Sequence, residues 1–337
     1  MSSTTVSPQE IVNARRVVGG EDDMYRGLSP RKYSWTTPWI ESSMANHWTW
    51  NEPNLTRDIS QYKTLPDNIR EGHDNALAFL SNLDSIQLGN LSINILPYLS
   101  CYEHRECVNR QVWEEEIHVR SYSTLIETIC DDPMDIYDRY RHNETLRKKN
   151  EFILSQSNLL MADGFSPKKF IVACAANVVL EGVYFYSGFL YMYAIARSQR
   201  KMFGEREMIA YINRDEENHL ELFANTSEDV KNENPECRSK EVEDSCLEVV
   251  DRGTMLEINW GQELIGDGMM GLTPEGIDHY IKYLANKRCV RLKLPKMYDT
   301  KYDKNPYPWV DQYSTPGESN FFESKPRTYQ ESGALEW

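Results

Sequence analysis

The sequence lacks several features, and each absence excludes a class of protein. No run reaches the roughly 18 uninterrupted apolar residues of a membrane span, and the first ten residues, MSSTTVSPQE, have neither the basic start nor the apolar centre of a signal peptide. The seven cysteines form no C-x-x-C pair, which argues against a zinc ribbon or a dithiol redox motif. We therefore expect reduced thiols and a cytoplasmic protein, in the host cytoplasm if the source is viral.

Positive charge is also scarce. The 337 residues include 37 Lys and Arg against 52 Asp and Glu, for a formal charge of −15. Nucleic-acid backbones and anionic membrane surfaces repel such a protein, so neither is an expected partner.

Long apolar stripes with a 3.6-residue period recur between residues 66 and 296, and glycine and proline are scarce inside them. This pattern predicts a helical domain over these residues. Residues 1–65 are expected to form an N-terminal arm with short helices, and residues 297–337 a strap followed by a flexible tail. A new helix is expected at Pro274, with Thr273 as its N-cap. The breaks between helices are expected near 89–90, 131–133, 164–167, 225–241 and 271–274.

The motif E-x-x-H occurs twice, as Glu115 with His118 and as Glu216 with His219. Residues three apart share a helix face, so the carboxylate and imidazole of each pair can reach one metal ion. With seven histidines and 52 acidic residues, chance alone yields about one such pair, so the motif by itself is weak evidence.

The surroundings of the two motifs strengthen the signal, because both lie within apolar stripes. The stripes read Val108, Val112, Glu115, His118, Tyr122, Leu125, Ile129 and Ile209, Ile212, Glu216, His219, Phe223. A third helix places Glu181 in the apolar face that runs from Cys174 to Ala196, and a fourth sets Asp84 four residues after Leu80. Four helices are therefore each expected to bring a carboxylate inward.

Four carboxylates buried together would repel one another strongly, and two divalent ions would neutralise them. One acid from each of two helices, plus E-x-x-H from each of two others, is the ligand inventory of di-metal ferritin-like bundles. We predict an all-α, ferritin-like helical bundle with additional helices. It would hold two iron or manganese ions per chain, since these suit oxygen-rich ligands with one imidazole each better than copper or zinc does.

Four motifs in order resemble the small subunit of class I ribonucleotide reductase over about residues 40–315. They are LDSIQ with Asp84, the E-x-x-H-x-x-x-Y run from Glu115 to Tyr122, LEGVYFYSGF with Glu181, and RDEENH with Glu216 and His219. Four separated motifs are more specific than any one of them. The resemblance implies that dioxygen, reacting at the di-metal centre, generates a tyrosyl radical at Tyr122, which is relayed to a large subunit for the reduction of ribonucleotides.

The resemblance also implies a division of the ligands between the two metals. One metal would be bound by Asp84, Glu115 and His118, and the other by Glu181, Glu216 and His219. Tyr122 lies one turn beyond His118, so its phenol is expected near the first metal. By their helical spacing Phe185, Phe189 and Ile212 are expected to form an apolar wall around it, although for Phe189 an ordinary core position competes closely with this interpretation.

The relay and the partners likewise follow from the resemblance. Trp48 and Asp215 match its inner positions, with Trp50 as an alternative to Trp48, and Asp215 is expected to hydrogen-bond to His118 from behind the metal. Tyr329 would carry the relay across the subunit interface, the tail ending at Trp337 would dock on the large subunit, and the chain would form a homodimer. Gln111 is a departure, because some relatives have Trp there.

Several residues near the expected ligands are expected to have no role in metal binding. Glu114, Glu116 and Glu217 flank the expected ligands but are turned off the stripe, which predicts solvated or ion-paired side chains. No role is expected for the other histidines, His47, His73, His104, His142 and His279.

Two rival functions remain open. The first is a di-metal oxidase or monooxygenase on the same scaffold that acts directly on an organic substrate, and it would have no use for a tail tyrosine. The second is a ferritin-like iron-handling protein, which would lack Trp48 and the tail.

Overall fold

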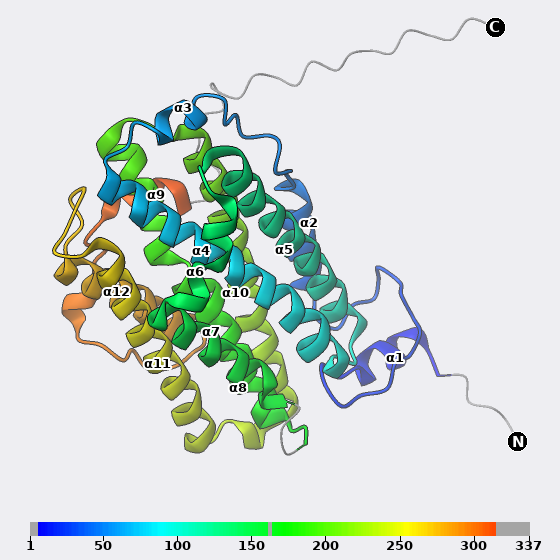
Figure 1. Ribbon diagram of the computed structural model, residues 1–337. Helices are drawn as coiled ribbons and strands as arrows, with labels where there is room; N and C mark the ends of the chain where they lie inside the picture. Colours follow the sequence, from blue (N-terminus) through cyan, green and yellow to red (C-terminus); the bar gives the residue numbers. More distant parts are fainter. Residues whose placement is uncertain (1–5, 161–163, 315–337) are drawn as a thin grey trace, which may run out of the picture.

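The structure, a computed structural model, describes residues 6–160 and 164–314 (Figure 1). These residues form helices and connecting segments with no strand, and their only β-type pairings are two isolated bridges, Val18 with Leu99 and Met269 with Leu272. The predicted all-α class is therefore confirmed. Tyr329 and the rest of the predicted tail lie outside the described residues.

Long helices packed side by side form the body of the protein (Figure 1). They are α4 (Asp67–Gly89), α5 (Tyr102–Ile129), α8 (Pro167–Val179), α9 (Tyr186–Gln199), α10 (Phe203–Glu233), α11 (Lys240–Ile265) and α12 (Pro274–Arg291). The other α-helices are α1 (Pro8–Ala14), α2 (Thr36–Ala45), α3 (Asp58–Tyr62), α6 (Pro133–His142), α7 (Glu144–Ser157) and α13 (Asp311–Ser314). The remaining short turns are the π-helical η1 (Asn90–Ile95) and η4 (Leu180–Tyr184) and the 3-10 turns η2 (Leu96–Tyr98), η3 (Asn158–Leu160), η5 (Pro235–Cys237), η6 (Thr300–Asp303) and η7 (Pro308–Val310).

Helix starts follow the local sequence closely. The Thr273 hydroxyl accepts a hydrogen bond from the Gly276 amide at 3.0 Å, and Pro274 occupies the first turn of α12, as predicted. The expected break at 225–241 is too wide, because α10 continues to Glu233. Its last turns keep a buried face that includes Phe223, Thr226, Ser227 and Val230, while Asn225, Glu228 and Asp229 are only partly buried, so the helix continues through this polar run.

The stripe that carries Glu181 is one rod, α8–η4–α9, with a π-helical turn in its middle. The sequence did not predict this turn, which places Glu181 and Gly182 in the widened segment. The buried Arg288 guanidinium donates a 2.9 Å hydrogen bond to the Gly182 carbonyl. A Cβ at Gly182 would lie 2.6 Å from Arg288 Nε, so the close approach requires glycine there.

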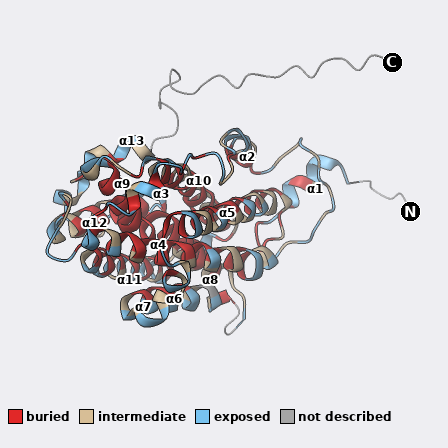
Figure 2. Ribbon diagram, turned by 45° about the horizontal axis from the view of Figure 1, so that its top comes forward, coloured by how far each residue is buried: buried red, intermediate tan, exposed pale blue. Residues whose placement is uncertain are grey.

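The same rod is the most apolar part of the protein. Residues 167–199 have a mean hydropathy of 1.5 over their most apolar window, and by length and composition alone they could cross a membrane. However, 89% of that window is buried inside the protein, against helices that include α10 and α11. Figure 2 shows buried residues concentrated along these central helices, which is the pattern of a core helix.

All seven cysteines are buried and unpaired.

A buried ion pair joins the outer helix α7 to α11. Lys149 and Glu257 are both fully buried, and the Lys149 ammonium hydrogen-bonds to the Glu257 carboxylate. The same ammonium lies 3.6 Å from the centre of the Phe79 ring, and Glu257 also accepts the Ser187 backbone amide at 2.9 Å. The pair therefore links α7 and α11 to the core rods α4 and α9.

We predict that Lys149→Met lowers the free energy of unfolding by about 3–5 kcal/mol, because it leaves the Glu257 carboxylate buried without its cation. The adjacent Lys148 provides the control, since its pair with Glu144 is exposed. Lys148→Met should cost only about 0–1 kcal/mol. Urea unfolding of both variants measures the difference, and equal losses would contradict the assigned role of the buried pair.

Candidate metal centre

The six expected ligands converge in the core, and all six are fully buried. They come from α4, α5, η4 and α10, and they form two groups whose potential ligand atoms lie within 4.8 Å of one another. The first group is Asp84, Glu115, His118 and Glu216, and the second is Glu115, Glu181, Glu216 and His219. Glu115 and Glu216 belong to both groups. The expected division gave each of them to one metal, whereas in this geometry both carboxylates would be available to either metal.

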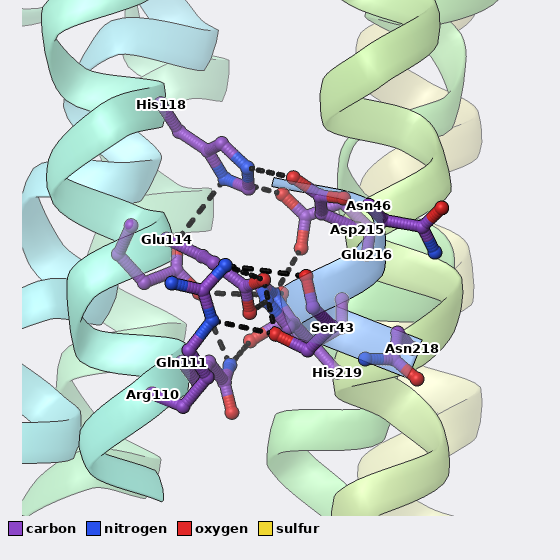
Figure 3. Close-up of polar contacts among 12 residues, drawn as sticks. Ser43, Asn46, Arg110, Gln111, Glu114, His118, Asp215, Glu216, Asn218 and His219 are labelled. Carbon is purple, nitrogen blue, oxygen red and sulfur yellow. Dashed lines mark hydrogen bonds and ion pairs between the residues drawn. The ribbon is translucent and has the colours of Figure 1, made fainter. Parts of the chain in front are cut away.

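Both imidazoles present the same nitrogen to the cluster. His118 Nδ1 lies 3.1 Å from Glu216 Oε1 and 3.5 Å from Glu115 Oε2. His219 Nδ1 lies 2.9 Å from Glu216 Oε2 and 3.3 Å from Glu115 Oε1. Figure 3 shows His118 reaching from α5 toward Asp215 and Glu216 on α10. Each Nδ1 is therefore available as a metal ligand.

Unsatisfied buried atoms support a metal-binding role for the cluster. Six atoms have no hydrogen-bond partner among the described residues: Asp84 Oδ1, Asp84 Oδ2, Glu115 Oε2, His118 Nδ1, Glu181 Oε2 and Glu216 Oε1. Buried polar atoms are rarely left unpaired, because desolvation without compensation costs free energy. Oxygen-rich ligands with one imidazole for each group suit two iron or manganese ions.

The charges of the cluster disturb one another strongly when no cation is bound. Burial, with the nearby Glu115 carboxylate, raises the pKa of Asp84 and of Glu181 well above the ordinary carboxyl range. Burial also opposes ionisation of Glu216, but the His118 and His219 imidazoles outweigh it and lower the pKa of that group. Two divalent cations would relieve the repulsion that drives the first two shifts.

Each histidine is oriented from behind by a carboxylate. His118 Nε2 lies 3.4 Å from Asp215 Oδ2, where a hydrogen bond was expected. His219 Nε2 lies 3.0 Å from Glu114 Oε2. These contacts fix the ring orientation and leave Nδ1 facing the other candidate ligands.

The role of Glu114 was missed by the sequence analysis, which expected a solvated or ion-paired side chain. Glu114 is ion-paired, with Arg110 at 3.1 Å, but it is also buried, and it accepts the Ser43 hydroxyl of α2 at 2.6 Å (Figure 3). Helix α2 covers this side of α5, so a position off the stripe is still inside the protein. Glu116 and Glu217 form the expected ion pairs, with Arg120 and Arg288.

Two glutamines hold the Glu181 carboxylate. Gln111 Nε2 donates to Glu181 Oε1 at 2.7 Å and to Glu115 Oε1 at 3.1 Å. Gln87 Nε2 donates to the same Glu181 oxygen and, at 3.0 Å, to Asn177 Oδ1. One Glu181 oxygen is thus fixed by amides while the other faces the cluster without a partner. No role was predicted for Gln87 from the sequence, but its position one turn after Asp84 places it on the same helix face as that expected ligand.

Tyr122 is fully buried, and its hydroxyl has no hydrogen-bond partner among the described residues. Burial raises the pKa of the Tyr122 phenol well above its ordinary value, and the Asp84 carboxylate adds to this shift. The expected wall residues Phe185, Phe189 and Ile212 are buried in the same hydrophobic core. The two phenylalanine rings stack with their centres 5.5 Å apart.

Trp48 lies directly behind His118. Its indole Nε1 donates a 2.6 Å hydrogen bond to Asp215 Oδ2, the oxygen that also faces His118 Nε2. The Trp48 and His118 rings are roughly parallel, with centres 6.2 Å apart. Trp50 instead lies under the Arg120 guanidinium, 5.1 Å from the ring centre. The contact with Asp215 therefore favours Trp48 over Trp50.

Comparison with known proteins places this site in a family. The family profile described as "Ribonucleotide reductase, small chain" matches residues 27–306. The beta subunit of ribonucleoside-diphosphate reductase from Treponema pallidum is 34% identical over 329 residues, covering 96% of this chain and 93% of the relative. This chain belongs to the ribonucleotide reductase small-chain family. The members of this family are oxidoreductase subunits with a ferritin-like fold and a di-metal centre.

Solved structures of the family agree with this assignment. The R2 subunit from Clostridium botulinum superposes with a TM-score of 0.84 at 36% identity, covering 89% of this chain and 94% of that one. A structure described as dimanganese(II)-NrdF from Streptococcus sanguinis has a TM-score of 0.73 over 86% of this chain and 99% of that one. Its 20% identity shows a shared fold only. The predicted ferritin-like bundle is confirmed.

The orienting role of Glu114 is testable in this family member. We predict that Glu114→Gln weakens metal binding at the His219 side by about 10–100-fold. The Glu114 carboxylate orients the His219 ring and makes it a more basic ligand, and the variant removes that negative charge. Glu116→Gln, on the exposed side of the same helix, is the matched control and should bind metal normally. Competition between protein and a chelator for Mn²⁺ measures the affinity, and equal affinities for the two variants would refute the assignment.

Proposed function

We propose that this chain is the radical-generating small subunit of a ribonucleotide reductase. Asp84, Glu115 and His118, with Glu181, Glu216 and His219, hold two iron or manganese ions, and Tyr122 becomes the stored radical. The observation that carries the proposal is a fully buried, unpartnered phenol beside two groups of ligands that share Glu115 and Glu216.

When bound, the two ions supply the oxidising power for this chemistry, with dioxygen as the terminal oxidant. The chain's own residues set the conditions under which Tyr122 loses one electron and one proton. No described residue donates a hydrogen bond to its hydroxyl. Phe185, Phe189 and Ile212 belong to the surrounding core and exclude water and soluble reductants, so the oxidised phenol persists.

The oxidising equivalent then leaves through Trp48. Asp215 connects Trp48 to His118, because one carboxylate oxygen contacts both side chains. This places an oxidisable indole next to a metal ligand while the carboxylate accepts the indole proton. Tyr329, in the tail beyond the described residues, continues the relay to the large subunit, on which the tail docks. The small subunit acts as a homodimer.

The substrate is bound by the large subunit. The name of the Treponema pallidum relative supports ribonucleoside diphosphates as the class that the complete enzyme reduces. The rival oxidase and iron-storage functions share the ligands but have no use for an isolated phenol linked to a relay.

The radical assignment is tested by electron paramagnetic resonance after the addition of ferrous or manganous ion and the corresponding oxidant. We predict a tyrosyl signal in the wild-type chain and its complete loss in Tyr122→Phe. Tyr184→Phe is the matched control, since the Tyr184 hydroxyl is also buried and unpartnered. It should keep the signal. No tyrosyl signal in the loaded wild-type chain, or a signal that survives Tyr122→Phe, would overturn the proposal.

The relay is tested separately from radical formation. We predict that Trp48→Phe retains the Tyr122 radical under reconstitution with excess reductant but loses deoxynucleotide formation with the large subunit, because phenylalanine is much harder to oxidise than tryptophan. Tyr329→Phe should behave in the same way while still binding the large subunit. Trp50→Phe, which changes a ring outside the Asp215 contact, should remain active. Full turnover in Trp48→Phe would contradict this route.

A further inference from the structure

A second buried cluster of potential ligands lies in the first half of α4, away from the di-metal groups. It contains His73 and Asp74 on α4 and Cys130 immediately after α5, and all three are buried. One ligand atom from each lies within 4.8 Å of the other two. At 1.5 Å per residue, the ten residues between Asp74 and Asp84 separate this cluster from the first metal group by about 15 Å.

His73 has the same hydrogen-bonding pattern as His219 of the di-metal centre. Its Nε2 lies 2.8 Å from the carboxylate of Glu205 on α10, as Nε2 of His219 lies 3.0 Å from Glu114. Its Nδ1 lies 2.9 Å from Asp74 Oδ1, as Nδ1 of His219 lies 2.9 Å from Glu216. A carboxylate behind one ring nitrogen and a potential ligand beside the other is the arrangement that fixes metal-binding histidines.

Two further observations separate His73 from an ordinary buried histidine. His104 also contacts a carboxylate through Nε2, at 3.0 Å from Asp229, but it belongs to none of the ligand clusters found in the described residues. The second oxygen of Glu205 is buried without a hydrogen-bond partner, like several oxygens of the di-metal centre. Among the described residues, His73 is the histidine that has a carboxylate at Nε2 and belongs to a ligand cluster containing both a carboxylate and a thiol.

We propose that His73 Nδ1, Asp74 and the Cys130 sulfur bind one additional divalent ion of the zinc class. Nitrogen, oxygen and sulfur in one ligand set suit zinc better than iron or manganese in an oxygen-rich site. Ligand atoms of a tetrahedral zinc site are about 3.3–3.5 Å apart. The distances from Asp74 Oδ1 to His73 Nδ1 and to Cys130 Sγ, 2.9 and 3.9 Å, lie on either side of that value.

The surroundings of the cluster allow an ion to reach it. The Asp74 side chain is 11% exposed, so the ion does not need to cross the core. Three protein ligands leave a fourth position for water. Binding releases two protons to solvent, one from the Cys130 thiol and one from His73 Nδ1, which hydrogen-bonds to Asp74 in the metal-free cluster. The thiolate and the unprotonated imidazole nitrogen are the metal-binding forms. Asp74 also accepts the Tyr62 hydroxyl at 3.0 Å and lies 3.7 Å from Arg139, and these contacts hold the carboxylate in place.

Such an ion would link the first half of α4, through His73 and Asp74, to the end of α5, through Cys130. Through Glu205, which contacts His73, it would also hold the first turn of α10. Asp84, Tyr122 and Glu216 lie further along these three helices. The ion would therefore fix the helices that carry the di-metal ligands without touching the ligands themselves.

The test uses the full chain with its di-metal centre already loaded with iron or manganese. Cobalt(II) is then titrated in as the probe, and the near-ultraviolet thiolate-to-cobalt charge-transfer band is recorded. None of the six di-metal ligands is a thiol, so this band reports only a cysteine site. We expect the band to saturate at one cobalt per chain, and excess zinc to displace the cobalt and remove the band.

Cys130→Ser should abolish the band while the iron or manganese content, the tyrosyl signal and the melting temperature in the absence of added cobalt or zinc stay close to wild type. Cys107→Ser is the matched control, because Cys107 is a buried cysteine of α5 that belongs to no ligand cluster in the described residues, and it should keep the band. If Cys130→Ser fails to fold, Glu205→Gln serves instead, with cobalt affinity expected to fall by about 10–100-fold.

The alternative is that no metal binds and that a protonated His73 ring simply bridges the Asp74 and Glu205 carboxylates. In that case the wild-type chain shows no charge-transfer band, or the band persists in Cys130→Ser, and either outcome overturns the proposal. Failure of the radical proposal is a different result, since it would remove the tyrosyl signal and leave the cobalt band unchanged.

Discussion

Mutual repulsion among buried carboxylates is the constraint on which the rest of this protein depends. Asp84, Glu115, Glu181 and Glu216 lie together without contact with water, so they need a compensating charge of about +4 to remain ionised. Two divalent ions would provide it, while the scaffold must hold the ligands in place before the ions arrive. Amide donors from glutamines, carboxylates behind the histidines and a π-helical turn at Glu181 do this from four different helices.

The carboxylates behind the histidines connect the centre to its surroundings. Asp215 contacts both His118 and Trp48, so orientation of a metal ligand and the first step of the proposed relay depend on one side chain. Glu114 is the counterpart for His219, but its other contacts run to Arg110 and to Ser43 of α2. The two sides of the centre are therefore supported differently, because Asp215 accepts a hydrogen bond from an indole, whereas Glu114 contacts a hydroxyl and a guanidinium.

A histidine held between a carboxylate and a potential metal ligand occurs both at the di-metal centre and in the cluster of His73, Asp74 and Cys130. At the di-metal centre the sequence predicted the buried histidines, because each E-x-x-H motif lies within an apolar stripe. The cluster of His73, Asp74 and Cys130 had no such motif. Its thiol comes from 56 residues away along the chain, and its supporting carboxylate, Glu205, from another helix still. The absence of paired cysteines excluded a zinc ribbon but not a site assembled across helices.

The sequence by itself determined the helical class, the inward-facing stripes and the identity of the residues that meet at the centre, because helical periodicity fixes which side chains share a face. Tertiary structure alone decided that Glu115 and Glu216 belong to both ligand groups, that Glu114 is buried under α2, and that Glu181 lies in a π-helical turn. These features depend on contacts between helices distant in sequence, which the spacing within one helix does not encode.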